Sequence, residues 1–279
     1  MRFSKGHGTQ NDFVVLPDPD GALDLTPERV AALCDRRRGL GADGVLRVVR
    51  WKALPGVGEP EPGVEWFMDY RNADGSIAEM CGNGVRVFAR YLAAAGLVGE
   101  PEFTIGTRAG LRSVSFAGGD AVHGDVAVGM GPAVVGARSS ARVGDKVYPG
   151  VAVDVGNPHL VCITGEPIAA LDLTAAPDHD PDLFPNGVNV EFVSPLRDDA
   201  ITMRVHERGV GETRSCGTGT VAAVVASLHH AGRAEGTVAV TTPGGRLRVT
   251  VTPDGTTLCG PAVLVAEGEL SDEWWANPA

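Results

Sequence analysis

The chain is poor in lysine and in aromatic residues, and it has no long hydrophobic run. Lys5, Lys52 and Lys146 are the only lysines among 279 residues, and the formal net charge of −11 is spread without acidic or basic blocks. Such a composition offers no basic surface for nucleic acid. No apolar stretch reaches the roughly 18 residues of a membrane-spanning helix, and no signal-like segment follows Met1. We therefore expect a cytoplasmic protein that binds neither nucleic acid nor membrane.

Paired cysteine motifs are also absent. The five cysteines form no Cys-x-x-Cys pair and no Cys/His pair at zinc spacing, which argues against a metal site. In a reducing compartment all five should be thiols. Cys34, Cys162 and Cys259 are interpreted as inert, buried small hydrophobes. Cys81 and Cys216 need a different explanation.

Glycine and proline are plentiful. The chain has 38 glycines and 19 prolines, and 43% of its residues are hydrophobic. This combination favours tight turns and short strands over long helices. We expect a β-rich mixed fold with enough apolar residues for a large core.

Four sequence features recur in the same order along the chain. Asn11 opens an apolar strand in "GTQNDFVVL", and Asn157 does so 146 positions later in "DVGNPHLVCI". "LDLT" occurs twice, "ADGVLRVV" is echoed by "PNGVNVEFV", and Cys81 is matched by Cys216 after 135 positions. Repeats in a fixed order indicate two copies of one βαβ-type unit. The first copy carries an extra segment, "WKALPGVGEPEPGVEW", which is predicted to be a long hairpin loop.

Helix signals differ between the two copies. Thr26, Pro27 and Glu28 predict a helix that begins there and ends near Arg37. In the second copy, Pro177 and Pro181 should shorten or abolish the equivalent helix. A second helix is predicted after each of Cys81 and Cys216, with Gly96 and Gly232 as the stops. The one after Cys216 is apolar all round and is expected to be buried; "TVAVTT" and "RLRVTV" are expected to be strands.

The position of Cys81 and Cys216, each directly before a helix, indicates reactive thiols. The first turn of a helix has unpaired N–H groups and a partial positive charge, which can lower a thiol pKa into a range of about 3.5 to 7.5. The Gly-Asn-Gly or Gly-Thr-Gly that follows offers N–H groups to a carboxylate. One thiolate and one thiol on opposite faces of an α-carbon could exchange its configuration, with coupled titrations and a bell-shaped pH profile.

Such a reaction also needs the carbanion-like transition state to be stabilised. Pyridoxal phosphate enzymes do so through a Schiff-base lysine, and none of the three lysines lies in an obvious phosphate-binding context. We infer that no cofactor is used. The helix ends would then stabilise the developing charge in a site closed to water.

The sequence resembles the diaminopimelate epimerases, cofactor-independent enzymes that convert LL-diaminopimelate to the meso form. The resemblance covers essentially the whole chain through "GTQNDFVV", "NADGSIAEMCGNGVRVFARYL", "DVGNPHLV", "NGVNVEFV" and "HERGVGETRSCGTGTVAAV". The two cysteine motifs alone would indicate the wider group of two-thiol racemases. "NADGS" and "ERGVGET" point to the epimerase itself.

The resemblance implies a role for each matching residue. Cys81 would remove the α-proton from the LL isomer, and Cys216 would reprotonate the other face. Residues implied to bind substrate comprise Gly82, Asn83, Gly217 and Thr218 at the reacting carboxylate, Asn11 and Asn157 near the reacting end, and Asn72, Asn189, Glu207 and Arg208 at the distal amino acid group. Arg208 can fork onto a carboxylate and Glu207 can pair with an ammonium group. His159 would support the site, and Gly44 stands where some members carry a glutamine.

Other interpretations remain open. Asn11 and Asn157 could cap turns, Glu207 and Arg208 could form a solvated pair, and His159 could be a satisfied core histidine. The whole chain could be a proline or hydroxyproline racemase, although the distal charges argue against this. It could also be a thiol redox or metal-binding module, which the wide spacing of the cysteines disfavours.

The expected fold is α+β, with two pseudo-symmetric domains that are each a curved, barrel-like mixed or antiparallel sheet around a central helix. The resemblance implies that the last strand returns to the first half, so residues 1–124 with 266–279 would form the half that carries Cys81, and residues 125–265 the half that carries Cys216. The site would lie in the cleft between them, with domain closure over a small-molecule substrate. The sequence leaves open whether the protein is a homodimer. The substrate places the activity in lysine and peptidoglycan precursor biosynthesis.

Overall fold

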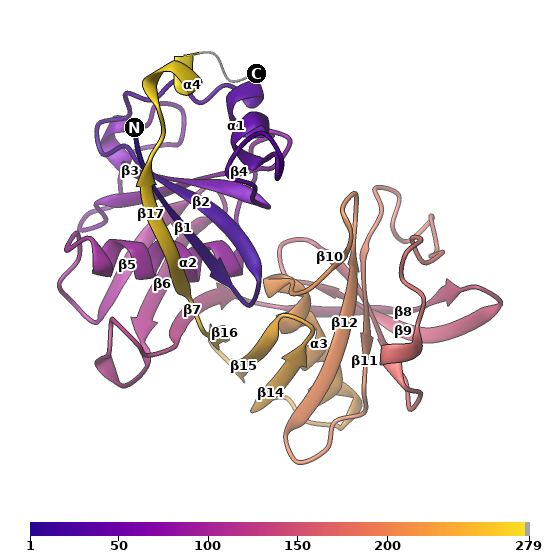
Figure 1. The fold of residues 1–279 in the computed structure, drawn as a ribbon. Helices are drawn as coiled ribbons and strands as arrows, with labels where there is room; N and C mark the ends of the chain where they lie inside the picture. The colour runs from indigo at the N-terminus through magenta and orange to yellow at the C-terminus, as the bar shows by residue number, and fades with distance from the viewer. Residues whose placement is uncertain (277–279) are drawn as a thin grey trace. The chain divides into compact units, whose positions relative to one another are not determined.

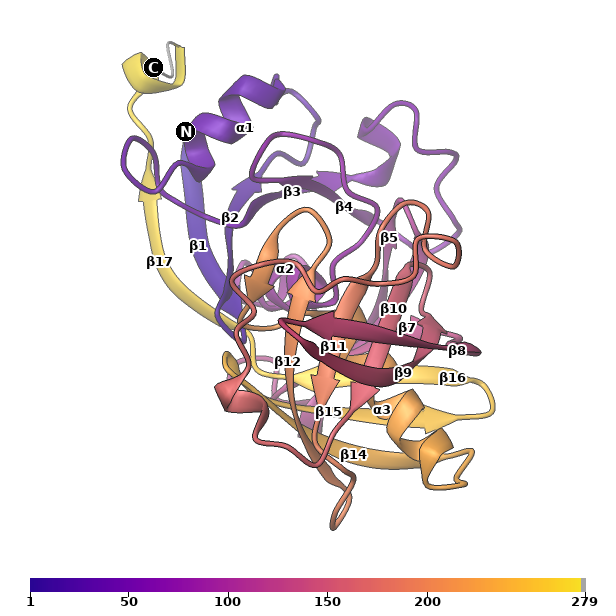
Figure 2. The ribbon, with the colours of Figure 1, turned by 90° about the vertical axis from the view of Figure 1, so that its right-hand side faces the viewer.

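The chain folds into two compact units. The structure is a computed structural model that describes residues 1–276 (Figures 1 and 2). Unit 1 comprises Met1–Val128 together with the chain from Pro261 onward, and unit 2 comprises Gly129–Gly260. Each unit has its own sheet and its own central helix, and each is described separately below.

The sheet of unit 1 is built from strands β1 to β7 and the C-terminal strand β17. β17 pairs antiparallel with β1, and β1 with β2. β2 runs parallel to β3, β3 antiparallel to β4, and β4 parallel to β5, after which β5, β6 and the start of β7 are antiparallel. The strand bounds are β1 (Arg2–Gly8), β2 (Asn11–Pro17), β3 (Gly44–Arg50), β4 (Trp66–Asn72), β5 (Glu102–Thr107), β6 (Gly110–Phe116), β7 (Val126–Gly131) and β17 (Val263–Glu269).

The sheet of unit 2 follows the same order of pairings. β8, β9 and β10 are antiparallel neighbours, β10 runs parallel to β11, and β11 is antiparallel to β12. β12 runs parallel to β14, followed by antiparallel β15 and β16, while the short β13 pairs with β12. The bounds are β8 (Val134–Val143), β9 (Lys146–Asp154), β10 (Pro158–Ile163), β11 (Asn189–Val193), β12 (Ala200–Glu207), β13 (Gly211–Thr213), β14 (Gly236–Thr242), β15 (Gly245–Thr252) and β16 (Gly255–Gly260).

This matching order confirms the internal repeat. In each unit two antiparallel strands lead into a parallel pair, then an antiparallel pair, a helix, and a second parallel pairing. β17 takes the place in unit 1 that β8 takes in unit 2, so the last strand of the chain completes the first sheet. The expected α+β class, two repeated sheets around central helices, is confirmed.

Each sheet surrounds one helix. Helix α2 (Gly82–Ala94) contacts β1, β2, β3, β4 and β17, and helix α3 (Gly217–His230) contacts most strands of unit 2. Eleven of the 14 residues of α3 are buried, as its uniformly apolar sequence predicts. Gly96 and Gly232 follow the two helices with φ of 66° and 72°, a left-handed conformation that ends a helix readily only at glycine.

Helix α1 (Pro27–Cys34) begins as predicted but ends three residues before Arg37. Thr26 accepts a hydrogen bond from Arg29 N, as an N-cap should. Asp35 then takes an extended conformation, and its carboxylate accepts the N–H groups of Arg37 and Arg38 at 2.8 and 2.9 Å. This Asx-type turn competes with the helix for the same N–H groups and ends it early.

Two further expectations from the sequence are confirmed. Residues 51–65 form the loop of the β3–β4 hairpin, with a 3-10 turn, η1 (Trp51–Ala53). Residues 171–184 contain turns and a bridge where unit 1 has α1, as Pro177 and Pro181 predict. The remaining elements are η2 (Ala117–Gly119), η3 (Ile168–Ala170) and α4 (Asp272–Ala276). Across residues 1–276 no helix is both long and apolar enough to cross a membrane.

Candidate active site

Cys81 and Cys216 occupy the same structural position in the two units. Each is the N-cap of the central helix, with extended φ and ψ of −140° and 118° for Cys81 and −116° and 123° for Cys216. Each sulfur accepts the N–H group three residues ahead, from Gly84 and Gly219, at 3.4 Å. The repeat thus places two equivalent thiols where an anion is stabilised by a helix N-terminus. Both cysteines are free thiols.

The glycine that closes each motif allows a close approach of the backbone. A Cβ atom at Gly219 would lie 2.6 Å from Glu191 Oε1, and one at Gly84 would lie 3.2 Å from the Leu46 side chain. In unit 2 the missing side chain therefore lets a buried carboxylate reach the first turn of α3. This explains why the motif ends in glycine there.

In unit 1, Asn11 and Asn83 lie beside Cys81. The Cys81 thiol donates to Asn11 Oδ1 at 3.6 Å, and Asn83 Nδ2 donates to the same oxygen at 3.1 Å. Gly82 and Asn83 form the first helical residues and are buried. The structure therefore brings together four of the sequence-predicted residues, Asn11, Cys81, Gly82 and Asn83.

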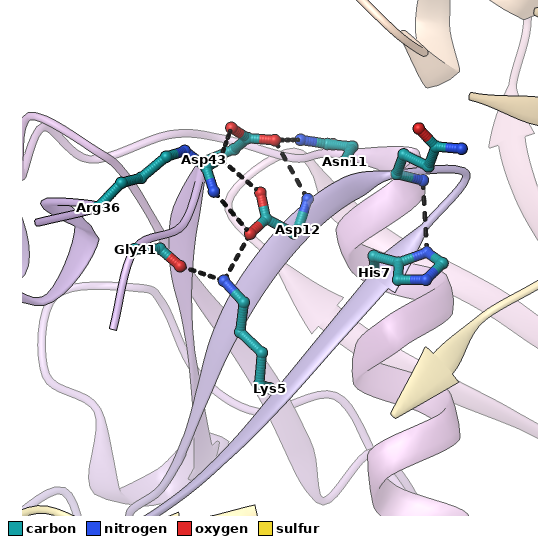
Figure 3. Close-up of polar contacts among 8 residues, drawn as sticks. Lys5, His7, Asn11, Asp12, Arg36, Gly41 and Asp43 are labelled. Atoms are coloured by element: carbon teal, nitrogen blue, oxygen red, sulfur yellow. Dashed lines mark hydrogen bonds and ion pairs between the residues drawn. The ribbon is translucent and has the colours of Figure 1, made fainter. Parts of the chain in front are cut away.

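A network of charged residues lies next to Asn11 (Figure 3). Asp43 accepts a hydrogen bond from Asn11 Nδ2 at 2.8 Å and pairs with Arg36 at 2.8 Å. Arg36 and Lys5 both pair with Asp12. Burial opposes ionisation of Asp12, but hydrogen bonds from Arg36 and Lys5 outweigh it and lower the pKa of Asp12 to about 2. The sequence analysis assigned no role to any of these charged residues.

Asn72 lies at the end of β4. Its Nδ2 donates to Ser76 Oγ at 3.0 Å within the "NADGS" turn.

Gly44 opens β3, where a Cβ atom would lie 2.5 Å from Arg71 O and 2.7 Å from the Tyr70 ring. This backbone therefore leaves no space for a side chain such as glutamine at position 44.

In unit 2 a chain of polar contacts leads from Cys216 to a buried carboxylate. Thr218 Oγ1 lies 3.5 Å from the Cys216 sulfur and accepts from Asn157 Nδ2 at 3.4 Å. His159 Nε2 lies 3.0 Å from Asn157 Oδ1, and its Nδ1 lies 2.7 Å from Glu191 Oε1. Because an amide oxygen can only accept, this arrangement requires the proton on Nε2. His159 and Glu191 are both fully buried, and burial raises the pKa of Glu191.

Glu191 was missed in the sequence analysis. It lies in "NVEFV", between residues that are all buried in β11. A charged residue inside a buried strand must have a polar partner, and this signal could have linked it to His159. Its second oxygen, Oε2, has no hydrogen-bond partner within the described part of the chain.

The expectation of a lowered thiol pKa is wrong for Cys216. Burial of the side chain, followed by the negative charges of Glu207 and Glu191, raises the pKa of Cys216 well above its usual range. Hydrogen bonds from Thr218 and Gly219 oppose this shift but do not reverse it. Desolvation and two nearby carboxylates therefore outweigh the hydrogen bonds at the start of α3 and favour the thiol form of Cys216.

Three of the four residues predicted to read the distal end of the substrate, all except Asn72, lie at the β12–β13 turn and the start of β11. Asn189 Oδ1 accepts the N–H of Arg208 at 2.9 Å, and Thr213 Oγ1 donates to Glu207 Oε1. Arg208 Nη1 donates to Asn186 O at 3.1 Å. Unit 2 thus brings Asn189, Glu207 and Arg208 together, and Gly217 and Thr218 lie in the first turn of α3.

No group of three or more His, Cys, Asp or Glu side chains arranged to hold a metal ion occurs within residues 1–276.

Known structures share this fold. A probable proline racemase from Agrobacterium radiobacter K84, solved with bound carbonate, aligns with a TM-score of 0.70 at 17% identity, over 99% of this chain and 94% of that one. A PhzF-family phenazine biosynthesis protein from Bacillus anthracis aligns with a TM-score of 0.70 at 16% identity, over 97% and 99% of the two chains. At such low identity these likenesses concern the fold alone.

Sequence comparison identifies the family. The family model described as diaminopimelate epimerase matches residues 3–136 and 151–270. The chain is 60% identical to a diaminopimelate epimerase of Mycolicibacterium smegmatis, over 99% of this chain and 98% of that protein. It is 59% identical to a diaminopimelate epimerase of Rhodococcus erythropolis, with the same two coverages. The chain therefore belongs to the diaminopimelate epimerase family.

Proposed function

We propose that this protein interconverts LL- and meso-diaminopimelate in the cytoplasm, in lysine and peptidoglycan precursor biosynthesis. The observation that carries the proposal is the pair of free thiols, each capping the central helix of one repeat, in a chain of this family. Two acid/base groups of one chemical type, one in each copy, suit a reaction that inverts a stereocentre.

In the proposed mechanism the Cys81 thiolate removes the α-proton of the LL isomer. The Cys216 thiol then donates a proton to the opposite face of the same carbon, and the roles reverse in the other direction. Support comes from the raised pKa of Cys216, caused first by burial, which keeps that sulfur protonated and able to act as the acid. Each turnover in one direction would exchange which sulfur carries the proton, so the two titrations are coupled.

Stabilisation of the carbanion-like transition state is assigned to backbone dipoles. The N–H groups of Gly82, Asn83, Gly217 and Thr218 would hold the reacting carboxylate as it takes up enediolate charge. Asn11 and Asn157 would bind polar groups near the reacting end, with His159 supporting Asn157. The distal amino acid group would be held by Asn72, Asn189, Glu207 and Arg208. No cofactor takes part in this scheme.

The domain assignment is part of the proposal. Residues 1–124 with 266–279 would be the half that supplies Cys81, and residues 125–265 the half that supplies Cys216. Each half alone has one thiol motif, so neither could act on both faces of a carbon. A homodimer is the assembly that we propose to test by light scattering.

Solvent isotope exchange tests the reaction. The reduced protein incubated with LL-diaminopimelate in deuterated water should place solvent deuterium on one α-carbon, because the abstracted proton is not the one returned. Mass and NMR spectra of the product would measure this. L-Proline and trans-4-hydroxy-L-proline serve as control substrates. Exchange with either of these, and not with diaminopimelate, would replace the proposal by an imino acid racemase.

Oxidation provides a second check on the thiol mechanism. We predict that activity requires a reductant, because a Cys81–Cys216 disulfide would remove both acid/base groups. Activity before and after a thiol oxidant, with recovery in dithiothreitol, measures this. Full activity of fully oxidised protein would rule out catalysis by free thiols.

A further inference from the structure

The Asn11 side chain contacts Asp43 on one side and Asn83 on the other, and the role of each partner in hydrogen bonding is fixed, that of Asn83 through Arg86. An amide can present either its oxygen or its nitrogen to a neighbour, so its orientation is set by its partners. On one side of Asn11 lies Asp43, and on the other lie Asn83 and Arg86. All of these residues belong to unit 1.

The Asp43 side fixes the nitrogen. An ionised carboxylate only accepts, so Asn11 must turn Nδ2 toward Asp43, which it does at 2.8 Å. The same Asp43 oxygen accepts the backbone N–H of Asp12 at 3.1 Å, and the other oxygen pairs with Arg36 at 2.8 Å (Figure 3). Asp43 therefore has a fixed position and a compensated charge.

The Arg86 side fixes the oxygen. A guanidinium only donates, so Asn83 must turn Oδ1 toward Arg86, and the bond from Arg86 Nη2 is 2.9 Å long. Asn83 then has only its Nδ2 to offer Asn11, and it donates to Asn11 Oδ1 at 3.1 Å. Arg86 is fully buried, which keeps this donor in place.

The turn that precedes Asn11 is held as well. Thr9 and Gln10 form the two-residue connection of the β1–β2 hairpin with φ of 50° and 65°, a conformation that is costly for residues other than glycine. Arg86 Nη2 donates to Thr9 Oγ1 at 3.2 Å, and the backbone N–H of Gln10 donates to His7 Nδ1 at 3.3 Å. The same arginine thus holds both the turn and Asn83.

We propose that Asp43 is a positioning residue, which acts through Asn11 to keep the Asn11 carbonyl oxygen directed at the Cys81 sulfur. Each donor meets an acceptor along the series from Arg86 through Asn83 and Asn11 to Asp43. If the Asn11 amide were reversed, its Nδ2 would face the Asn83 Nδ2 donor and its Oδ1 would face the Asp43 carboxylate. The Cys81 thiol donates to the oxygen that this order exposes, at 3.6 Å. The part of the proposal that concerns turnover rests on the proposed function, and the arrangement of the thiol does not.

Asp43→Asn tests the proposal, because an amide at this position can either accept or donate. The Asp43 side chain is 43% exposed, so the variant is expected to fold. We expect kcat/KM for diaminopimelate epimerisation to fall roughly tenfold to a hundredfold, because Asn11, which binds substrate in the proposed function, loses its fixed orientation and a misplaced binding group can cost about 100-fold. The matched control is Asp24→Asn, which removes a surface carboxylate paired with Arg29. Equal kcat/KM in the two variants would overturn the proposal.

Arg36→Gln separates the amide contact from the ion pair. Arg36 pairs with Asp12 and Asp43 and does not contact Asn11. If Asp43 acts through Asn11, Arg36→Gln loses less activity than Asp43→Asn, and Asp43→Asn has no further effect in an Asn11→Ala background. An equal loss in Arg36→Gln, or full additivity with Asn11→Ala, would show that the ion pair alone matters.

A thiol measurement makes the test independent of epimerase activity. In Asp43→Asn the Asn11 amide is held from the Asn83 side alone, so orientations with Nδ2 toward the sulfur become accessible, and an N–H group facing the sulfur would stabilise the thiolate, the reactive form. Cys81 should then be alkylated by iodoacetamide several-fold faster than in the unaltered protein at one fixed pH, as followed by peptide mass spectrometry, with no change in Asp24→Asn. An unchanged rate would overturn the proposal, even in a protein with no epimerase activity.

Discussion

Cys81 and Cys216 share a backbone geometry but not their surroundings. Asn11 and Asn83 lie beside Cys81, both of them neutral amides. Cys216 lies near Glu207 and Glu191, and burial, followed by the charges of these carboxylates, raises its pKa. The thiol motifs could be found from the sequence because N-cap and glycine signals are local. The pKa of Cys216 could not, because Glu191 reaches it from a strand 25 positions earlier in the chain.

Arg208 offers the test of substrate binding at the scale of one residue. If its guanidinium forks onto the distal carboxylate, Arg208→Ala should raise KM about tenfold to a hundredfold, with a smaller change in kcat, because a hydrogen bond to a charged group is lost. Arg208→Lys keeps the charge but cannot form the two-pronged contact, so its KM should lie between those of the unaltered protein and Arg208→Ala. Steady-state kinetics and thermal melts of all three proteins measure this. A collapsed melting temperature with unchanged KM in the folded fraction would make Arg208 structural.

At the scale of elements, the helix starts were predictable and one helix end was not. Thr26, Cys81 and Cys216 each cap a helix as their local sequence predicts. The end of α1 depends on whether the Asp35 carboxylate or the helix takes the N–H groups of Arg37 and Arg38, and the sequence pattern does not decide this competition. Likewise, the Lys5, Arg36, Asp12 and Asp43 network joins β1, β2 and the chain between α1 and β3, which only the sheet register brings together.

This network predicts a stability that depends on pH. The pKa of Asp12 is about 2 in the folded protein, below that of an unfolded aspartate, because bonds from Arg36 and Lys5 outweigh burial. The contribution of Asp12 to the free energy of unfolding is therefore present above about pH 4 and is lost as the pH falls toward 2. Asp12→Asn should lower the free energy of unfolding at pH 7 by on the order of 2 kcal/mol. Urea titrations at about pH 7, 4 and 3 should show this difference shrinking, and a constant difference would contradict it.

For the molecule as a whole, duplication was readable because the four repeated features keep their order. The position of the last strand, in contrast, could not be predicted from the local sequence. Nothing local in "VLVAEGE" says which sheet it joins; the family resemblance implied only that the last strand returns to the first half, and the structure pairs it with β1. β17 gives β1 its second antiparallel neighbour, and the chain just before it accepts a bond from Arg86 Nε at Pro261 O. Unit 1 is thus completed by the final segment of the chain.

A truncation test follows from this arrangement. A chain ending at residue 260 leaves β1 with an unpaired edge and uncovers part of α2, which contacts β17. The loss of several hydrogen bonds and of buried apolar surface, on the order of 3 kcal/mol, should lower the melting temperature of unit 1 by roughly 10 °C. Limited proteolysis with mass spectrometry should show unit 1 cleaved first, while residues 129–260 persist. A chain ending at residue 270 keeps β17 and loses α4, so the melting temperature of its unit 1 should fall much less. If both truncations destabilise unit 1 equally, α4 and its packing against α1 matter more than the strand does.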